Sequence, residues 1–234
     1  HADYLNKYDG QTVTTANTGN IEKIGNTSYS WDRYRFLKQA KLSSYDYVDM
    51  LYDVDGIRYK KTHYDNGTTI THNYVCEGTK ILSENIIGGS YAGTLNYLYI
   101  GNQIIGFTYK NKQYYYQKNL QGDIIRIYDT SNNLVAYYQY DAWGNHRVYN
   151  PTGTINTSDS FIGNINPFRY RGYYYDVETG LYYCNSRYYN PEWGRWISPD
   201  SIEYLDPSSI NGLNLYAYCG NDPVNRYDPS GHFA

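Results

Sequence analysis

The residues best placed to do chemistry are aspartates near the end of the chain. Asp228-Pro-Ser-Gly231 ends three residues before the last position, and Asp206-Pro-Ser-Ser209 begins 22 positions before Asp228, with Ser in place of the final Gly. Asp200, in Ser-Pro-Asp, is the rival partner for Asp228. Two carboxyl groups held close together cannot both ionise cheaply, so one keeps a proton and acts as an acid while the other activates water as a base. The simpler alternative is that both segments form turns in which Asp caps backbone amides.

Arg226 is a further candidate because it stands two residues before Asp228. A guanidinium there would hold a carboxylate in its charged form or steady a substrate carbonyl, and a surface ion pair is the alternative role. The sequence has no Gly-x-Ser-x-Gly elbow, phosphate-binding loop or Gly-rich dinucleotide motif, so no cofactor is expected.

Metal-binding patterns are weak. Asp53-Val-Asp-Gly56 lacks the later ligands and the closing Glu of a calcium loop, which favours a hairpin turn. The histidines show no metal-ligand spacing, so turn and surface roles are expected for His63, His72 and His146. The three cysteines are an odd number and widely spaced, which excludes a dense disulfide scaffold and predicts buried or free thiols at Cys76, Cys184 and Cys219.

Tyrosine dominates the apolar composition, with 34 Tyr against five Phe and one Met, which is typical of strands. The net charge of −3, without any block of like charge, gives no general attraction for phosphate backbones or anionic membranes, so nucleic-acid binding is not expected. The longest apolar runs, such as Ile100–Phe107, fall far short of a membrane span. At 234 residues the chain is long enough for one all-β unit or two small domains.

The dipeptide Tyr-Asp, hereafter YD, indicates an internal repeat. It occurs eight times, whereas random placement of these residues would give about 2.5 occurrences. Tyr52 and Tyr64, like Tyr128 and Tyr140, are 12 residues apart, a length that suits two strands and a turn. Each Asp is expected to accept hydrogen bonds from the backbone amides of its turn, while the Tyr ring packs against the next hairpin. The tyrosines of the eight units are Tyr8, Tyr45, Tyr52, Tyr64, Tyr128, Tyr140, Tyr175 and Tyr227.

The segments between these turns have the alternation of half-buried strands. Polar and apolar residues change sides with a period close to two in Ile57–Tyr64 and Gly122–Tyr128. Ser28–Leu42 contains no Gly or Pro and mixes charged with apolar residues, and we favour a strand pair over a short helix there. Asn150–Asn166 is dense in turn formers and is the best candidate for a boundary or an exposed loop. Stacked hairpins of this kind build a curved wall.

The strongest pattern is the run from Asn166 to Asp200, in which aromatic residues, Arg and Gly follow one another at close intervals. This run resembles the Rhs repeat-associated core of bacterial Rhs, wall-associated WapA and toxin-complex C proteins. The resemblance continues through Gly212–Gly231, and its specific part covers roughly residues 128 to 231. It implies an all-β fold in which a ribbon of YD hairpins spirals into a hollow β-cocoon around a variable C-terminal toxin, with the core as its inward-turned end. Clustered Tyr, Trp and Arg are suited to cap an exposed β-edge by stacking.

The resemblance also implies an intramolecular aspartyl protease. In the family, paired Asp-Pro-x-Gly motifs direct cleavage just beyond the second motif and free the toxin. Carried over to this chain, the pair is Asp206 and Asp228 with Asp200 as rival partner and Arg226 nearby, and cleavage is expected near His232. Ser stands here where the first motif has Gly, and His232 stands where Leu is frequent.

We therefore expect a YD-repeat sheet over residues 1–127 and an Rhs core over residues 128–234. The expected function is structural: the chain belongs to a shell that encloses and presents a toxic domain linked to it in a longer parent chain. The expected location is secreted or at the bacterial cell surface, with the export signal upstream of His1. The alternative is a cell-wall or carbohydrate-binding module, in which Trp143 and Trp193 would stack on sugar faces.

Overall fold

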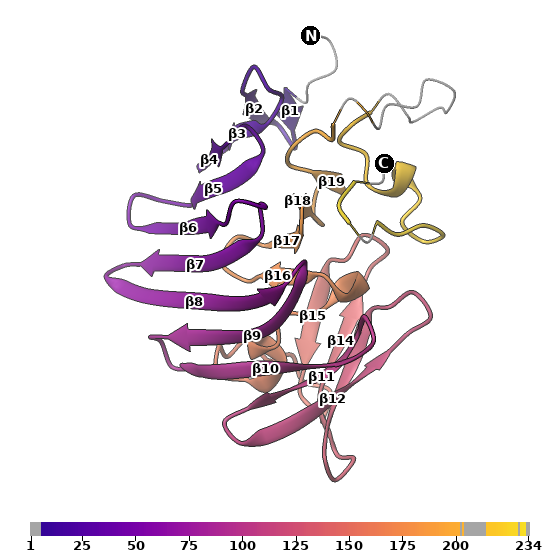
Figure 1. Cartoon of the computed structure of the whole chain (residues 1–234). Helices are drawn as coiled ribbons and strands as arrows, with labels where there is room; N and C mark the ends of the chain where they lie inside the picture. Colours follow the sequence, from indigo (N-terminus) through magenta and orange to yellow (C-terminus); the bar gives the residue numbers. More distant parts are fainter. Residues whose placement is uncertain (1–5, 202, 204–213, 229, 233–234) are drawn as a thin grey trace.

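The structure, a computed structural model, describes residues 6–201, 203, 214–228 and 230–232. Within these ranges the chain consists mainly of strands and turns, with one four-residue α-helix and short 3-10 turns. A long antiparallel sheet curves around a second, four-stranded sheet (Figure 1). The prediction of a mostly β fold is confirmed.

In the large sheet, every strand pairs with its neighbours in the sequence, so the spatial order is the chain order from β1 to β15. The large sheet, β1 to β15, is hereafter called the wall. It is open, with β1 and β15 as its edges, so the described residues do not form a closed shell. The strands are β1 (Lys7–Tyr8), β2 (Gln11–Thr15), β3 (Ile21–Ile24), β4 (Thr27–Asp32), β5 (Phe36–Lys41), β6 (Asp46–Tyr52), β7 (Arg58–Asp65), β8 (Thr68–Glu77), β9 (Lys80–Ile87), β10 (Gly93–Ile100), β11 (Gln103–Tyr109), β12 (Lys112–Lys118), β13 (Ile124–Asp129), β14 (Leu134–Tyr140) and β15 (His146–Tyr149).

Side chains in the large sheet alternate between an inner and an outer face, as the period-two pattern predicts. In β14, for example, Ala136 and Tyr138 are buried while Gln139 is exposed. Several ladders also shift register by one residue, such as the β8–β9 ladder between Val75 and Cys76. Bulges of this kind bend the bulged strand and increase its twist, which accounts for the curvature of the sheet.

Three aspartates of the YD repeat cap hairpin turns, whereas Asp46 bonds to His63. Oδ1 of Asp53 accepts hydrogen bonds from the amides of Asp55 and Ile57 at 3.0 and 2.8 Å. Asp129 and Asp141 accept the same two bonds, from the amides two and four residues further on. The capping role expected of these aspartates is confirmed at the three turns, and the Asp53 segment is a hairpin turn as expected.

The small sheet contains β16 (Tyr174–Asp176), β17 (Leu181–Cys184), β18 (Arg187–Asn190) and β19 (Arg195–Trp196). All residues of β17 and β18 are buried because both faces of this sheet are covered. Leu181, Tyr183 and Tyr188 join the core of the large sheet, whereas Tyr182 and Tyr189 join a separate aromatic cluster. The small sheet is therefore packed between the wall and the C-terminal loops.

Two predictions about segments have mixed outcomes. Ser28–Leu42 contributes β4 and β5, as favoured. Asn150–Asn166 contains exposed turns, but it also forms α1 (Ile162–Ile165), in which Gly163 and Ile165 are buried, so it is only partly an exposed loop. The shorter 3-10 segments are η1 (Tyr170–Gly172) and η3 (Cys219–Asn221).

The division between residues 127 and 128 stays a prediction, although β13 runs across it without a break. All three cysteines are free thiols, and Cys184 and Cys219 are buried, as predicted.

Candidate functional site

A buried arginine, Arg187 at the start of β18, lies at the centre of the candidate site. Its guanidinium stacks 4.1 Å above the ring of Trp196, on the side of the small sheet that faces the aromatic cluster. Burial lowers the pKa of Arg187, and the negative charges of Asp200 and Asp228 oppose this shift. A buried cation in this position requires a carboxylate partner.

Asp228 provides one such carboxylate. Its Oδ2 lies 3.4 Å from Nη2 of Arg187. Its Oδ1 accepts hydrogen bonds from the amides of Ser230, Gly231 and His232 at 3.2, 2.8 and 3.1 Å. Asp53, Asp129 and Asp141 cap their turns through Oδ1 in a similar way, whereas Oδ2 of Asp228 faces Arg187.

Asp200 reaches the same guanidinium from the segment after β19. Its Oδ2 lies 2.8 Å from Nη2 of Arg187. Its Oδ1 accepts a hydrogen bond from the amide of Ser201 at 2.8 Å and lies 3.1 Å from Nδ1 of His232. The carboxyl groups of Asp200 and Asp228 are at most 1% exposed, so one guanidinium bridges two buried carboxylates.

The backbone carbonyl groups of Asp228 and Gly231 are held beside these groups. Nε of Arg187 donates a hydrogen bond to the carbonyl oxygen of Gly231. Gly231 has a φ of +77°, and a Cβ there would lie 2.5 Å from the carbonyl oxygen of Cys184, so the approach requires glycine. Oη of Tyr173 donates to the carbonyl oxygen of Asp228 at 2.5 Å and accepts from its amide at 3.2 Å. The guanidinium that contacts both carboxylates therefore also polarises a peptide carbonyl.

Comparison with known proteins places this chain in a family. Residues 145–224 match the family described as Teneurin YD-shell. The tRNA nuclease WapA of Bacillus subtilis is 36% identical over 231 residues, which cover 98% of this chain and 9% of WapA. Toxin subunit YenC1 of Yersinia entomophaga is 33% identical over 117 residues, which cover 50% of this chain and 11% of YenC1. The chain belongs to the YD-repeat shell family.

This YD-shell segment also has the fold of a solved relative. The crystal structure of TcdB2-TccC3 matches 91% of this chain and 11% of that chain, with a TM-score of 0.74 and 23% sequence identity. The likeness shows a shared long antiparallel sheet. The chain spans less than a tenth of the length of the WapA relatives, so the activities in their names belong to those proteins.

Two of the four predicted site residues meet in the YD-shell segment. Asp200 and Asp228 share Arg187, whereas Asp206 lies outside the described residues. Arg226 lines an open hollow of about 1190 Å³ between turns of the large sheet and the C-terminal loop, and its predicted role stays a prediction.

Sequence reasoning missed Arg187, which lies 41 positions from Asp228 and resembles the other arginines of the aromatic run. The available signal was the arginine in Ser-Arg-Tyr-Tyr-Asn. If this aromatic segment is a buried strand, its arginine is buried too and requires a carboxylate partner.

The histidines depart from the roles expected for them. His72 is buried, with Nδ1 2.5 Å from Oε1 of Glu84, so the surface role predicted for it is wrong. His146 is enclosed by aromatic rings, including that of Tyr175 at 4.6 Å. Among the described residues, no three His, Cys, Asp or Glu side chains gather as a metal site would need. No described helix is long and apolar enough to cross a membrane.

Proposed function

We propose that this YD-shell segment is part of the wall that encloses a toxin, and that its Arg187 site cuts the chain beside His232. The first half is supported by the similarity to WapA and YenC1 and by the shell-type sheet. The observation that carries the second half is the meeting of two buried carboxylates, one guanidinium and the Gly231 carbonyl.

The geometry suits hydrolysis of the Gly231–His232 bond. Arg187 donates to the carbonyl oxygen and would stabilise the oxyanion that forms when water adds to the carbonyl carbon. One carboxyl group accepts the proton that water loses, and the other gives a proton to the departing nitrogen, so the C–N bond breaks to a carboxylic acid and an amine. Oδ1 of Asp228 accepts the hydrogen bond of the His232 N–H at 3.1 Å, so we assign Asp228 as the acceptor of the proton that water loses and Asp200 as the proton donor.

Self-cleavage is tested with a chain extended past Ala234 by a folded reporter domain, followed by electrophoresis and intact mass. The wild type is expected to release a reporter whose first residue is His232. Asp228→Asn and Asp200→Asn should each slow release by at least about 100-fold, because each removes a positioned acid or base. Asp222→Asn, on the same loop, is the matched control and should cleave at the wild-type rate.

Asp206→Asn separates the two candidate partners of Asp228. If Asp206 were the partner, this variant would stop release and Asp200→Asn would not. Equal release by the wild type and Asp228→Asn, or release by neither, rules out self-cleavage.

Enclosure of a toxin is tested in the parent protein. The domain that follows this segment should resist added protease while the wall is intact and become sensitive when the wall is unfolded. Equal sensitivity in both states would contradict enclosure. Secretion or display on the bacterial surface is part of the same proposal, and fractionation of cells and medium checks it.

The glycan-binding alternative gains no support from the two tryptophans named for it. Trp193 packs on Tyr8, with ring centroids 5.5 Å apart, and Trp143 lies against Gly194. Both indoles are partly buried by these contacts. Glycan binding stays a prediction, which a binding assay with single Trp143 and Trp193 variants would test.

A further inference from the structure

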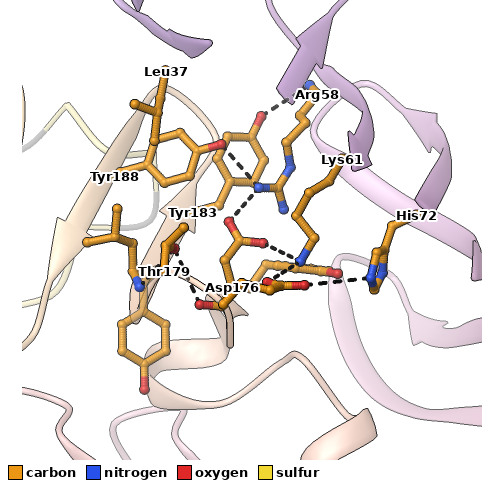
Figure 2. Close-up of polar contacts among 12 residues, drawn as sticks. Leu37, Arg58, Lys61, His72, Asp176, Thr179, Tyr183 and Tyr188 are labelled. Carbon is orange, nitrogen blue, oxygen red and sulfur yellow. Dashed lines mark hydrogen bonds and ion pairs between the residues drawn. The ribbon is translucent and has the colours of Figure 1, made fainter. Parts of the chain in front are cut away.

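A second buried polar network joins the two sheets. Figure 2 shows Arg58 and Lys61, both from β7, reaching toward Asp176 at the end of β16. Nη1 of Arg58 donates to Oδ2 of Asp176 at 2.5 Å, and Nζ of Lys61 donates to Oδ1 of Asp176 at 2.9 Å. Lys61 also donates to Oε2 of Glu178 at 2.8 Å. These four side chains are at most 7% exposed, so the network lies in the interior between wall and small sheet.

Asp176 differs from Asp53, Asp129 and Asp141, whose carboxylates cap their turns. It follows Tyr175, but its carboxylate points toward the large sheet, and its turn is closed by backbone amides of Thr179 and Gly180 that donate to its carbonyl oxygen. Replacing a buried ion pair by apolar residues of similar size is often neutral or stabilising, so stability alone does not explain this charge. Directional bonds do specify one relative position of the two sheets, which apolar contacts specify less sharply.

The network also holds β18 through Tyr188. Nη1 of Arg58 donates to Oη of Tyr188 at 3.1 Å (Figure 2). Oη of Tyr52 lies 2.8 Å from the same oxygen. The Arg58 guanidinium further lies 4.3 Å from the ring centre of Tyr183, which pairs with Tyr188 across the β17–β18 ladder. Adjacent residues of a strand point to opposite faces, so Tyr188 faces the network while Arg187 faces Asp200 and Asp228.

We propose that Arg58 and Asp176 form a latch that sets the position of β18, and through it the position of Arg187 against the two carboxylates. The inference rests on the proposed self-cleavage. Arg58 and Asp176 do not contact the Gly231 peptide and are positioning residues. Cleavage would then depend on the position of the small sheet relative to the wall. If Arg58 does not hold β18, β18 shifts and Arg187 no longer lies against Asp200.

The first experiment distinguishes an effect on the position of Arg187 from an effect on the stability of the fold. Arg58→Met combined with Asp176→Leu removes one charge of each sign and leaves Lys61 paired with Glu178. We expect its thermal midpoint to equal or exceed that of the wild type, while reporter release slows by up to about 100-fold, the cost of a misplacement of about 1 Å. Tyr188→Phe removes only the hydroxyl that links Arg58 to β18, and should slow release to a smaller extent without unfolding the chain.

The matched control is Lys61→Met combined with Glu178→Leu, which removes a buried pair of the same network that does not contact Tyr188. It should release the reporter at the wild-type rate. Wild-type release in both Arg58→Met/Asp176→Leu and Tyr188→Phe would overturn the latch, and so would equal slowing in the control.

Hydrogen exchange distinguishes failure of the latch from failure of self-cleavage. If the wild type releases no reporter, the proposed self-cleavage is wrong, but amide exchange over residues 187–190 still reports the position of β18. Exchange there should be faster in Arg58→Met/Asp176→Leu than in the wild type and in the control pair. Unchanged exchange in the double variant would overturn the latch whether or not the chain cleaves.

Discussion

At the scale of single residues, the buried and half-buried polar groups divide into those that need a charge and those that stay neutral. His146 belongs to the second group, because Nη1 of Arg169 donates to its Nε2, which must therefore carry no proton. Its Nδ1 lies 3.0 Å from Oη of Tyr182. Burial, followed by the positive charge of Arg169, lowers the pKa of His146 to about 3.

This shift predicts a dependence of stability on pH. Between the ordinary His value of 6.5 and the folded value of about 3, the unfolded chain binds a proton at His146 that the native chain does not. The free energy of unfolding should therefore fall as pH falls through this window, by up to about 1.4 kcal/mol per pH unit from this group. His146→Gln keeps a hydrogen-bond acceptor but does not titrate. Urea unfolding at pH 7, 6, 5 and 4 should show a shallower decline for His146→Gln, and parallel curves would contradict the assignment.

At the scale of elements, one repeat motif produces two structural roles. Asp53 caps a hairpin through Oδ1, whereas Asp176, also preceded by Tyr, forms a buried pair with Arg58. Asp53→Ala should lower the free energy of unfolding by about 1–2 kcal/mol, the worth of its turn bonds. Asp176→Ala should lower it by about 3–5 kcal/mol, because Arg58 then has no carboxylate in the interior. Urea unfolding measures both values. Equal decreases in the free energy of unfolding would contradict the distinction between the two aspartates.

The same comparison marks what the sequence makes predictable. The hairpins and the turn cap of Asp53 follow from contacts within four residues, so a repeat pattern suffices to predict them. Asp176 depends on Arg58, 118 positions away, and Asp228 depends on Arg187, 41 positions away. Nothing local distinguishes these aspartates from the capping ones. The resemblance to Rhs cores implied Asp206 as the partner of Asp228, with Asp200 as the rival. The structure places Asp200 and Asp228 on Arg187, a residue that the resemblance did not single out, and the role of this group in cleavage stays a prediction.

At the scale of the whole molecule, the two sheets share one apolar core. Residues of the wall such as Leu95 and Val48 belong to the same buried cluster as Leu181 and Ile197 of the C-terminal part. Backbone bonds also cross between the parts, from the amide of Ile21 to the carbonyl of Ile197. The wall is therefore covered on its inner face by the small sheet, and removal of that cover would expose a large apolar surface.

This packing predicts that the two parts do not fold independently. A chain of residues 1–149 keeps every strand of the large sheet but exposes its inner face, so it should lose its sigmoidal urea transition, bind a hydrophobic dye and associate. A chain of residues 16–234 loses only the edge strands β1 and β2, and should unfold cooperatively at a lower midpoint because each strand contacts mainly its neighbours. Mixing residues 1–149 with residues 150–234 should restore the transition. The contrary outcome is a cooperative transition of residues 1–149 alone, at the urea midpoint of the whole chain. It would show that the wall is an independent domain, and it would count against a latch that couples the two sheets.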